Sequence, residues 1–408
     1  MIIKEKCSIC SSPVEEIIDL GVCPPANNFV EDFNQPAQSY PLIIDFCNQC
    51  FCIQLRHCLS KDELYSFYTY STPKIDSLES HYSDLLVKLK DLGFAKNQQS
   101  CIEIGSNNGN LLKFLEPHFD KVLGVDPARN IAQIAIDNGV ETIVDFFSSQ
   151  VAQELVSQDR KFDVAIARHM FAHNEDPANL LAAMNLILKD DGIFLIENAY
   201  ALDTFQNGEF DQIYHEHMFY FSALNISALM EKFDFELLDF SHSLVHGGSG
   251  VFICGKKGSH IPHISVQHTI EKERKAFKGN KIFNDFKKKI EFNKIQAMDL
   301  IKDEINQGHV VGAYGAPAKA FTAFSYYELD NNSIAFCIDT TPTKIGKIFP
   351  YFNIPIFSEE ALRDLEYHAL IVNAWNYKED ILKKAPFIFK KGTKLIFLIP
   401  DLEIHTVK

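Results

Sequence analysis

The sequence contains no run of about 18 uninterrupted apolar residues, and its first residues, MIIKEKCSIC, lack an apolar signal core. A helix that spans a bilayer needs about 20 apolar residues, so the sequence predicts no membrane segment and a cytoplasmic protein. Positive charge is also scarce, because the formal net charge is −15. This balance argues against a surface that binds nucleic acid or anionic lipid, although it leaves room for a local basic pocket.

Low-complexity tracts and short-period repeats are absent from the 408 residues. Hydrophobic residues make up 46% of the chain, which is enough for packed cores and excludes general disorder. With about 150 residues per domain as a guide, the length predicts two or three domains. Nothing in the sequence decides between a monomer and a dimer.

Ten cysteines are present, and their spacing is more informative than their number. Cys7 and Cys10 form one CxxC pair, and Cys47 and Cys50 form another. Four thiolates can bind a structural, tetrahedral Zn²⁺ that keeps no open position for water. The alternative is a set of ordinary buried thiols. Three further ligand-type residues lie nearby and could replace one of the four: Cys52, His57 and Cys58.

The pattern of strands and helices divides the chain into parts. Residues 1 to about 60 have short strand-like runs, such as YPLIIDF, and little helical pattern, so a zinc ion would hold them together. An amphipathic helix follows at 81–94, and from CIEIG (101–105) to GIFLIEN (192–198) strands and helices alternate. Alternation predicts a parallel sheet covered by helices. The later run GGSGVFICGKK is predicted to be an edge strand.

The remaining sequence predicts a lysine-rich helical connection at 264–308 and a second α/β unit that begins with HVVGAYGAPAKA at 309. The predicted fold class is therefore α/β, in three parts. They are a zinc-binding module at 1–75, a unit with a Rossmann-like parallel sheet at 76–262, and a smaller Rossmann-like α/β unit at 263–408.

The stretch CIEIGSNNGNLLKFL reads as a strand, a glycine turn and the start of a helix. Gly105 and Gly109 allow positive φ and a close approach of the backbone to a ligand, and Asn107 lies between them. Because the turn is not G-x-G-x-x-G, a dinucleotide pyrophosphate on the helix N-terminus is disfavoured.

Acidic residues mark three successive strand ends. Glu103 precedes the glycine turn, Asp126 ends the next strand and suits the two hydroxyls of a ribose, and Asp145 follows the third strand. Asp145 and the adjacent Phe146 suit the amine and the ring of adenine. Together these groups suit an adenosine without phosphates. The pattern resembles the class I methyltransferases, which use S-adenosylmethionine; the alternative is a purely structural strand–turn–helix.

The run YHEHMFYF, at 214–221, places Tyr214, Glu216 and His217 within four positions and surrounds them with aromatic residues. Groups that carry protons are costly to bury unless they are paired. Beside a predicted cofactor pocket, such a cluster indicates catalysis; the alternative is a satisfied polar cluster at a helix end.

Taken with ARHMFAHNEDP (167–177), the CxxC pairs, GAYGAPAKA and WNY, the run resembles the nucleotide-sugar C-methyltransferase family over nearly the whole chain. Members of that family place a methyl group on C3 of a 4-keto-6-deoxy sugar. The resemblance implies a nucleotide-diphosphate 4-keto-6-deoxy sugar as substrate and a role in the biosynthesis of a branched deoxysugar. Relatives act on other carbons or other nucleotide carriers, so the exact substrate does not carry over.

Methylation of carbon requires an enolate, hence a base near neutral pKa and a donor to the oxyanion. His217 is the predicted base, since a neutral imidazole suits the task. Glu216 could orient it or balance its charge, and Tyr214 could donate to the enolate oxygen or position the sugar. The resemblance aligns these three residues with the active-site histidine, glutamate and tyrosine of the family.

Further candidates follow from the resemblance. Tyr68 and Tyr70 are predicted to line the sugar, although relatives often continue with several serines where this chain has Ser71-Thr72-Pro73-Lys74. His169 is assigned to the cofactor, and His173 to the substrate with a structural role as the alternative. Arg168 is expected to touch one or the other. The run HGGSG, at 246–250, could close on the sugar or form a hairpin turn.

The resemblance places the nucleotide diphosphate of the substrate in the carboxy-terminal unit. Backbone amides at the turn after Tyr314, together with Lys319, can bind phosphate oxygens, and Asp339 can bind a ribose or a base. A capping unit without ligand contacts is the alternative. Two other functions stay open: an O- or N-methyltransferase acting on a nucleotide sugar, and a non-catalytic nucleotide-sugar-binding protein.

Overall fold

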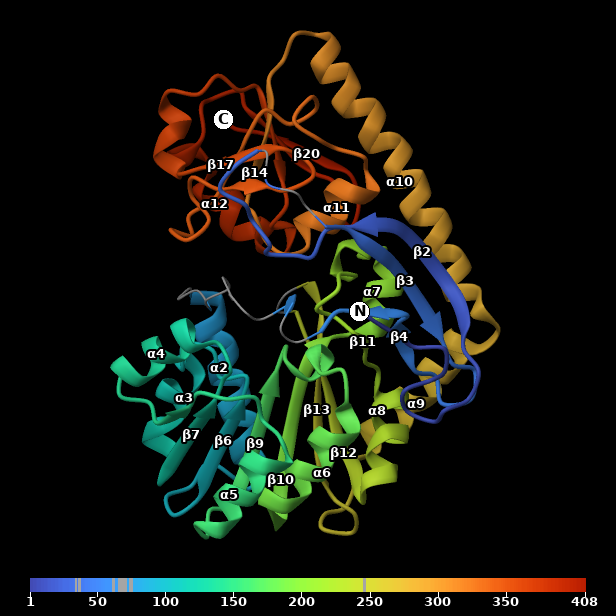
Figure 1. Cartoon of the computed structure of the whole chain (residues 1–408), viewed down its shortest axis with the longest axis vertical. Helices are drawn as coiled ribbons and strands as arrows, with labels where there is room; N and C mark the ends of the chain where they lie inside the picture. The colour runs from blue at the N-terminus through green and yellow to red at the C-terminus, as the bar shows by residue number, and fades with distance from the viewer. Residues whose placement is uncertain (34, 36–37, 61–62, 65–71, 73–75, 245–246) are drawn as a thin grey trace.

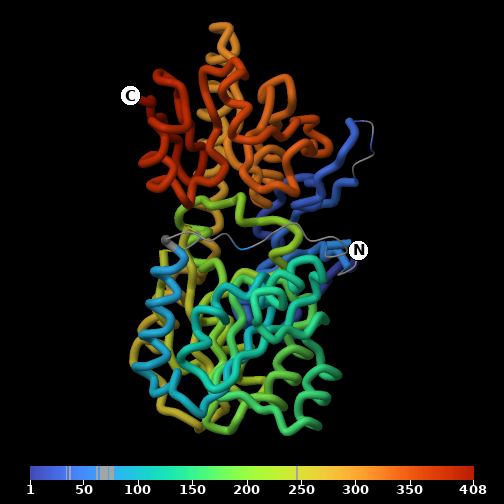
Figure 2. The backbone as a smooth tube through the Cα atoms, turned by 90° about the vertical axis from the view of Figure 1, so that its left-hand side faces the viewer, coloured from blue at the N-terminus to red at the C-terminus, as the bar shows by residue number. Residues whose placement is uncertain are grey.

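A computed structural model describes the whole chain except residues 34, 36–37, 61–62, 65–71, 73–75 and 245–246. Two large sheet units lie at opposite ends of the molecule, and a smaller amino-terminal sheet lies beside the junction between them (Figures 1 and 2). Helix α10 (Lys281–Asn306) runs along one side, from the carboxy-terminal unit past the amino-terminal sheet. In the part of the chain that is described, no helix is both long and apolar enough to cross a bilayer.

The amino-terminal sheet contains a strand from a distant part of the chain. Its order is β11-β4-β3-β2, and β1 pairs separately with β5. The bounds are β1 Ile2–Ile3, β2 Glu15–Cys23, β3 Tyr40–Phe46, β4 Ile53–Leu55, β5 His57–Cys58 and β11 Phe219–Tyr220. Strand β11 pairs antiparallel with β4, with Phe219 opposite Gln54 and Tyr220 opposite Ile53. The YHEH run therefore leads directly into the sheet of the amino-terminal module.

The central sheet has the order β12-β13-β10-β9-β6-β7-β8. The bounds are β6 Ser100–Ile104, β7 Lys121–Val125, β8 Thr142–Ile143, β9 Phe162–Arg168, β10 Leu188–Ala199, β12 Phe235–Ser243 and β13 Ser249–Lys256. Strand β13 is antiparallel to both of its neighbours, β10 and β12, and the other strand pairs of this sheet are parallel. The prediction that this run is an edge strand is wrong, because β13 fills the place between β10 and β12 and is buried along almost its whole length. The edge position belongs to β12.

Helices cover the central sheet as the alternating sequence predicts. Their bounds are α2 Asp76–Asp91, α3 Asn110–Leu115, α4 Arg129–Asp137, α5 Ser149–Ser157, α6 Pro177–Ile187 and α8 Ala223–Met230, whereas α7 (Ala201–Asn207) packs against α10. Local capping fixes several starts. The Ser148 side chain accepts from the backbone N–H of Val151 at the start of α5, and Ser222 and Asn225 form a reciprocal capping box at the start of α8.

The carboxy-terminal sheet has the order β16-β17-β15-β14-β18-β19-β20, with a parallel centre and an antiparallel strand at each edge. The bounds are β14 Val311–Tyr314, β15 Cys337–Ile338, β16 Ile348–Phe349, β17 Ile354–Phe357, β18 Ala369–Val372, β19 Lys394–Phe397 and β20 Glu403–Thr406. Helices α11 (Ala320–Tyr326) and α12 (Lys378–Ile388) follow β14 and β18. Helix α9 (Ile264–Phe277) and α10 form the predicted helical connection.

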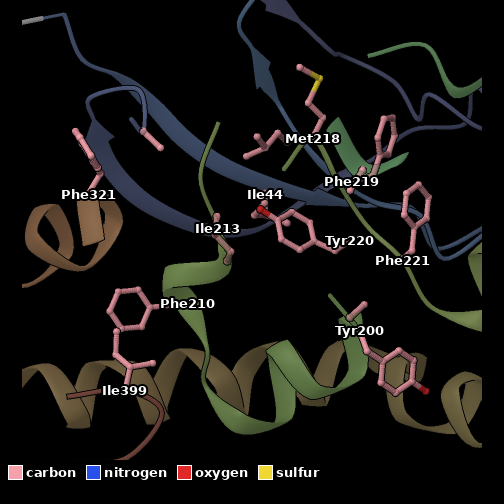
Figure 3. Close-up of a cluster of buried hydrophobic side chains, with 14 of the residues drawn as sticks. Ile44, Tyr200, Phe210, Ile213, Met218, Phe219, Tyr220, Phe221, Phe321 and Ile399 are labelled. Carbon is pink, nitrogen blue, oxygen red and sulfur yellow. The ribbon is translucent and has the colours of Figure 1, made fainter. Parts of the chain in front are cut away.

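A buried cluster of large side chains joins the three units (Figure 3). Ile44 comes from the amino-terminal sheet, Phe210 and Tyr220 from the segment around the YHEH run, and Phe321 and Ile399 from the carboxy-terminal unit. The ring of Phe210 also lies 5.2 Å, centroid to centroid, from that of Tyr327. The segment from Phe210 to Phe221 is thus held between all three units.

Candidate active site

The four predicted zinc ligands come together. Their sulfur atoms all lie within 4.8 Å of one another, and the Cys7–Cys50 and Cys10–Cys47 sulfur distances are 3.4 Å. These separations are too long for disulfide bonds and suit tetrahedral Zn–S bonds of about 2.3 Å. The set of four thiols fits a structural Zn²⁺.

A single cleft of about 920 Å³ is lined by residues of all three units. The predicted site residues among its lining are Glu103, Gly105, Asn107, Asp126, Phe146, His169, His173, Tyr214, Glu216, His217, Tyr314, Lys319 and Asp339. Gly109 and Asp145 are not among the described residues that line it. Tyr68 and Tyr70 lie outside the described residues. The sequence therefore predicted one shared site, and the roles within it stay predictions.

The glycine turn after β6 needs its glycines for two different reasons. Gly105 has φ of 71°, and a Cβ there would lie 2.6 Å from Cγ of Met170. Gly109 has φ of 75°, and a Cβ there would lie 2.9 Å from Cβ of Ala135 on α4. Gly105 thus shapes the floor of the cleft, whereas Gly109 allows close packing of α3 against α4.

Asp126 holds the turn in place from the next strand. Its Oδ2 accepts from the backbone N–H of Asn107 at 2.8 Å, and its Oδ1 accepts from that of Ala128 at 2.9 Å. Each carboxylate oxygen has a second lone pair, so Asp126 can still accept from ribose hydroxyls. Asp145 differs, because β8 ends at Ile143 and Asp145 is exposed, bonded to the backbone N–H of Phe146.

The carboxy-terminal unit contains a similar glycine turn that is bonded to a carboxylate from the neighbouring strand. Asp339 follows β15, its Oδ2 accepts from the backbone N–H of Ala316 at 2.7 Å, and its Oδ1 accepts from that of Thr341 at 2.7 Å. Gly315, with φ of 88°, stands in the turn after β14 as Gly105 stands after β6. Two glycine turns, each held by a carboxylate from the neighbouring strand, therefore line one cleft.

A buried ionic network lies near the carboxyl ends of β9 and β10 and was missed from the sequence. Glu197, at the end of β10, lies 2.7 Å from His81 Nε2 and 3.6 Å from Arg168 Nε. Although burial opposes it, these neighbours and His169 lower the pKa of Glu197 to about 2. An acid directly after the apolar run GIFLI was a usable signal for Glu197. His81, within an ordinary amphipathic helix, gave none.

Glu103 completes this end of the cleft. Burial raises its pKa to about 8, against the opposing charge of Arg168. Oε2 of Glu103 and Nη1 of Arg168 are buried without a hydrogen-bond partner among the described residues. Unpaired buried polar atoms in a cleft wall fit a ligand that carries both donors and acceptors, as the amino-acid end of S-adenosylmethionine does.

The YHEH run positions its last histidine from two sides. Nδ1 of His217 lies 2.8 Å from the carbonyl oxygen of Gln212, and Nε2 lies 2.6 Å from the hydroxyl of Tyr214. A carbonyl only accepts, so Nδ1 carries the proton and Nε2 accepts from Tyr214. Burial lowers the pKa of His217 to about 4, which keeps the imidazole neutral. His173 lies beside it, with ring centroids 5.1 Å apart.

Glu216 has a partner that the sequence did not reveal. Its Oε1 accepts from the side-chain amide of Asn27 at 2.9 Å, and its predicted role of orienting His217 or balancing its charge stays a prediction. Burial raises the pKa of Glu216 to about 7, and Asn27 and Lys344 oppose the rise. His215 points elsewhere, and its ring packs edge-on against Tyr40 of β3.

Lys319 is enclosed at the carboxy-terminal end. Its Nζ donates to Oδ1 of Asn376 at 2.6 Å and lies 3.8 Å from the ring centre of Trp375. Burial lowers its pKa to about 8, and the charges of Asp211 and Glu209 oppose the shift. Three more lysines of the carboxy-terminal unit line the cleft, Lys344, Lys383 and Lys384. These three were not predicted as site residues.

Comparison with known proteins decides the family. Residues 7–65 match a family model described as a zinc binding domain, residues 78–239 a methyltransferase domain, and residues 244–400 a C-methyltransferase C-terminal domain. The chain is 30% identical over 404 residues to the C-methyltransferase NovU of Streptomyces niveus, covering 97% of this chain and 96% of NovU. The chain belongs to this C-methyltransferase family.

More distant matches cover smaller parts of this C-methyltransferase. An uncharacterized methyltransferase, YcgJ of Bacillus subtilis, is 26% identical over 155 residues, or 34% of this chain and 60% of YcgJ. A solved S-adenosylmethionine-dependent methyltransferase from Clostridium acetobutylicum superposes with a TM-score of 0.36 and 14% identity, over 43% of this chain and 91% of that one.

The family and the site together identify the chemistry at its coarse level. The protein is an S-adenosylmethionine-dependent C-methyltransferase with a structural zinc module. The predicted family, fold class and cofactors are confirmed.

Proposed function

We propose that this C-methyltransferase methylates C3 of a nucleotide-linked 4-keto-6-deoxyhexose, in the biosynthesis of a branched deoxysugar. The observation that carries the proposal is the neutral imidazole of His217, whose basic Nε2 lies in a cleft shared by two glycine turns. The cleft volume, about 920 Å³, is at the upper end of the roughly 300–1,000 Å³ of small-molecule sites and suits two ligands.

The turn after β6 is the proposed cofactor end. Gly105, Asn107 and Asp126 would hold the ribose, Phe146 would stack on the adenine, and His169 would contact the methionine part. Asp145 stays a weaker candidate, because it is exposed and outside the cleft lining. When bound, S-adenosylmethionine supplies an electrophilic methyl group.

The chain's own residues prepare the carbon that accepts the methyl group. The C3–H bond breaks, its electron pair moves into the enolate formed with the C4 carbonyl, and the proton ends on Nε2 of His217. The Tyr214 hydroxyl, now bonded to that nitrogen, either passes the proton or turns to donate to the enolate oxygen. Burial keeps the imidazole neutral at neutral pH, and its pKa of about 4 also makes it a weaker base than an exposed histidine.

The carboxy-terminal end would bind the nucleotide diphosphate. Lys319, Lys383 and Lys384 supply positive charge for the diphosphate, and Tyr314 and Asp339 would contact the ribose or base. His173 would border the sugar beside His217. Tyr68 and Tyr70 keep their predicted place along the sugar.

A screen by mass spectrometry tests the substrate. The protein is incubated with S-adenosylmethionine and a panel of nucleotide sugars with and without a 4-keto group, and products are scanned for the mass of one added methylene. We expect the gain only with the keto sugars. Methylation of sugars that lack the ketone would instead indicate transfer to oxygen or nitrogen.

Deuterium exchange tests the enolate. Without cofactor, in deuterated water, the protein should exchange the hydrogen at C3 of the keto sugar, and His217→Gln should not. If the protein methylated the sugar normally but did not exchange the C3 hydrogen in the absence of cofactor, a free enolate would be contradicted.

A further inference from the structure

Asn27 brings the amino-terminal module into the active site. It follows β2 and lines the cleft, and its side-chain amide donates to Oε1 of Glu216 across 189 residues of sequence. Its φ is 62°, a left-handed conformation that Asn adopts more readily than most residues. This left-handed backbone conformation directs the Asn27 amide toward Glu216.

The turn around Asn27 is held firmly from the carboxy-terminal unit. The backbone N–H of Phe29 donates to the carbonyl of Asn27 at 2.9 Å. The ring of Phe29 packs against Phe321 and Phe349, at centroid distances of 5.2 and 5.0 Å, and Val30 forms a bridge with Ile348. The position of the Asn27 amide thus depends on packing between two units.

Glu216 depends on this amide. Its side chain is 2% exposed, and the bond from Asn27 is the one hydrogen bond to its carboxylate that the described residues provide. The charged group that faces it is Lys344, whose Nζ is itself bonded to the carbonyl of Ala316. A buried carboxylate with a single donor responds strongly to the loss of that donor.

The zinc ligands lie next to the strands that support the same loop. Cys47 directly follows β3, and Cys50 precedes β4. Strand β4 pairs with β11, which begins at Phe219, shortly after Glu216 in the sequence. A metal that fixes the β3–β4 connection therefore also fixes the strand in which the YHEH run ends.

We propose that Asn27 is a positioning residue that sets the orientation and protonation of Glu216 in the cleft, and that the zinc module supports the same run through the pairing of β4 with β11. This inference rests on the proposed function for its effect on the rate, and on geometry alone for its effect on the carboxyl. It gives the structural metal a consequence for catalysis without any contact between metal and substrate.

Two variants at position 27 distinguish the effect of the side-chain amide from the effect of the turn conformation. Asn27→Gly removes the donor and keeps a residue that adopts positive φ without strain. Asn27→Asp keeps the shape and the turn but replaces the donor with an acceptor. Asn353→Gly is the matched control, because Asn353 has φ of 58°, is exposed and is not among the residues that line the cleft.

The first measurement is the titration of Glu216 in the protein without substrate. Difference infrared spectra, with Glu216→Gln as the reference, follow the protonated carboxyl band against pH. In Asn27→Gly the midpoint should rise by about one pH unit, the effect expected when a charged group loses one hydrogen bond. Asn27→Asp should shift it at least as far, and Asn353→Gly should not shift it.

Activity and metal content complete the test. In both Asn27 variants kcat should fall about tenfold or more with little change in KM and with the zinc retained, and the pH profile should move with the carboxyl. Chelation of the zinc from the wild-type protein should reproduce the infrared shift. An unmoved carboxyl in folded, zinc-loaded Asn27 variants would overturn the proposal. Because the infrared arm needs no substrate, failure to methylate nucleotide sugars would count against the proposed function alone.

Discussion

The indole nitrogen of Trp375 donates a 2.6 Å hydrogen bond to Oδ2 of Asp211. This bond crosses from the carboxy-terminal unit to the turn Phe210–Gln212, whose last carbonyl orients His217. Burial raises the pKa of Asp211, and the charge of Lys319 and this indole hydrogen bond oppose the rise; Oδ1 has no hydrogen-bond partner among the described residues. Trp375 is also the one tryptophan of the sequence.

Trp375→Phe should therefore weaken both stability and catalysis. Loss of the bond removes the indole donor from a buried carboxyl, at a cost of about 1–3 kcal/mol in the free energy of unfolding. The rate should fall as well, because the turn that holds His217 loosens. Urea unfolding and methyl-transfer rates measure the two effects. Tyr367→Phe, which removes a hydrogen bond to Lys390 elsewhere in the same unit, should lower stability without lowering kcat.

His217 and His215 provide a matched pair of buried imidazoles two positions apart. His217→Gln should reduce methyl transfer by at least about a hundredfold, the scale of a lost general base, while cofactor affinity stays within a few-fold. His215→Phe should keep most of the activity, since that ring packs on Tyr40 away from the cleft. Calorimetry and a rate assay check both. If His217→Gln lost cofactor binding together with turnover, His217 would be a cofactor residue instead.

Gly105 should be the critical glycine for cofactor binding. Gly105→Ala places a methyl group against Met170 in the cleft floor, in addition to the strain of positive φ. We expect S-adenosylmethionine affinity to fall by about tenfold or more, which corresponds to about 1.4 kcal/mol. Gly139→Ala is the comparison, because Gly139 also has positive φ but a Cβ there would approach only Lys113 Nζ, at 4.0 Å. Equal loss of affinity in the two variants would show that strain, and not the cleft contact, is responsible.

Stability should fall with decreasing pH in a window set by the buried histidines. Burial lowers the pKa of His215 to about 4, whereas in the unfolded chain it is about 6.5. Between these values the unfolded chain binds a proton that the folded chain does not. The free energy of unfolding therefore falls as pH drops through this window, by at most about 1.4 kcal/mol per pH unit from this residue. In His215→Phe that contribution should be missing. The difference in the free energy of unfolding between the wild-type protein and the variant should therefore fall with decreasing pH below about pH 6.5 and stay constant above it. A level difference throughout would contradict the prediction.

Local patterns were enough to predict most elements and most of the predicted residues that line the shared cleft. Gly105 and Asp126 lie at strand ends, and apolar runs between glycine turns mark those ends directly. Tyr214 and His217 are close in sequence, so their pairing required no knowledge of the tertiary structure. The four cysteines were readable for the same reason, as two pairs with ligand spacing.

The contacts that control these groups could not be predicted in the same way. The Glu216–Asn27 and Trp375–Asp211 bonds join residues 189 and 164 positions apart, and no periodicity reports such separations. Strand β13 was misplaced at an edge, because its burial depends on the distant pairing with β10 and the hairpin with β12. Asp145 was expected directly after the third strand, but β8 ends at Ile143 and Asp145 is exposed.

Strand β11 limits how this enzyme can be recombined with its relatives. It lies within the predicted span 76–262 but is an integral part of the amino-terminal sheet, paired with β4. A chimera that exchanges only the residues before 76 would set a foreign β4 against the resident Phe219 and Tyr220. Functional hybrids should therefore require that residues 209–221 be inherited from the same parent as the zinc module.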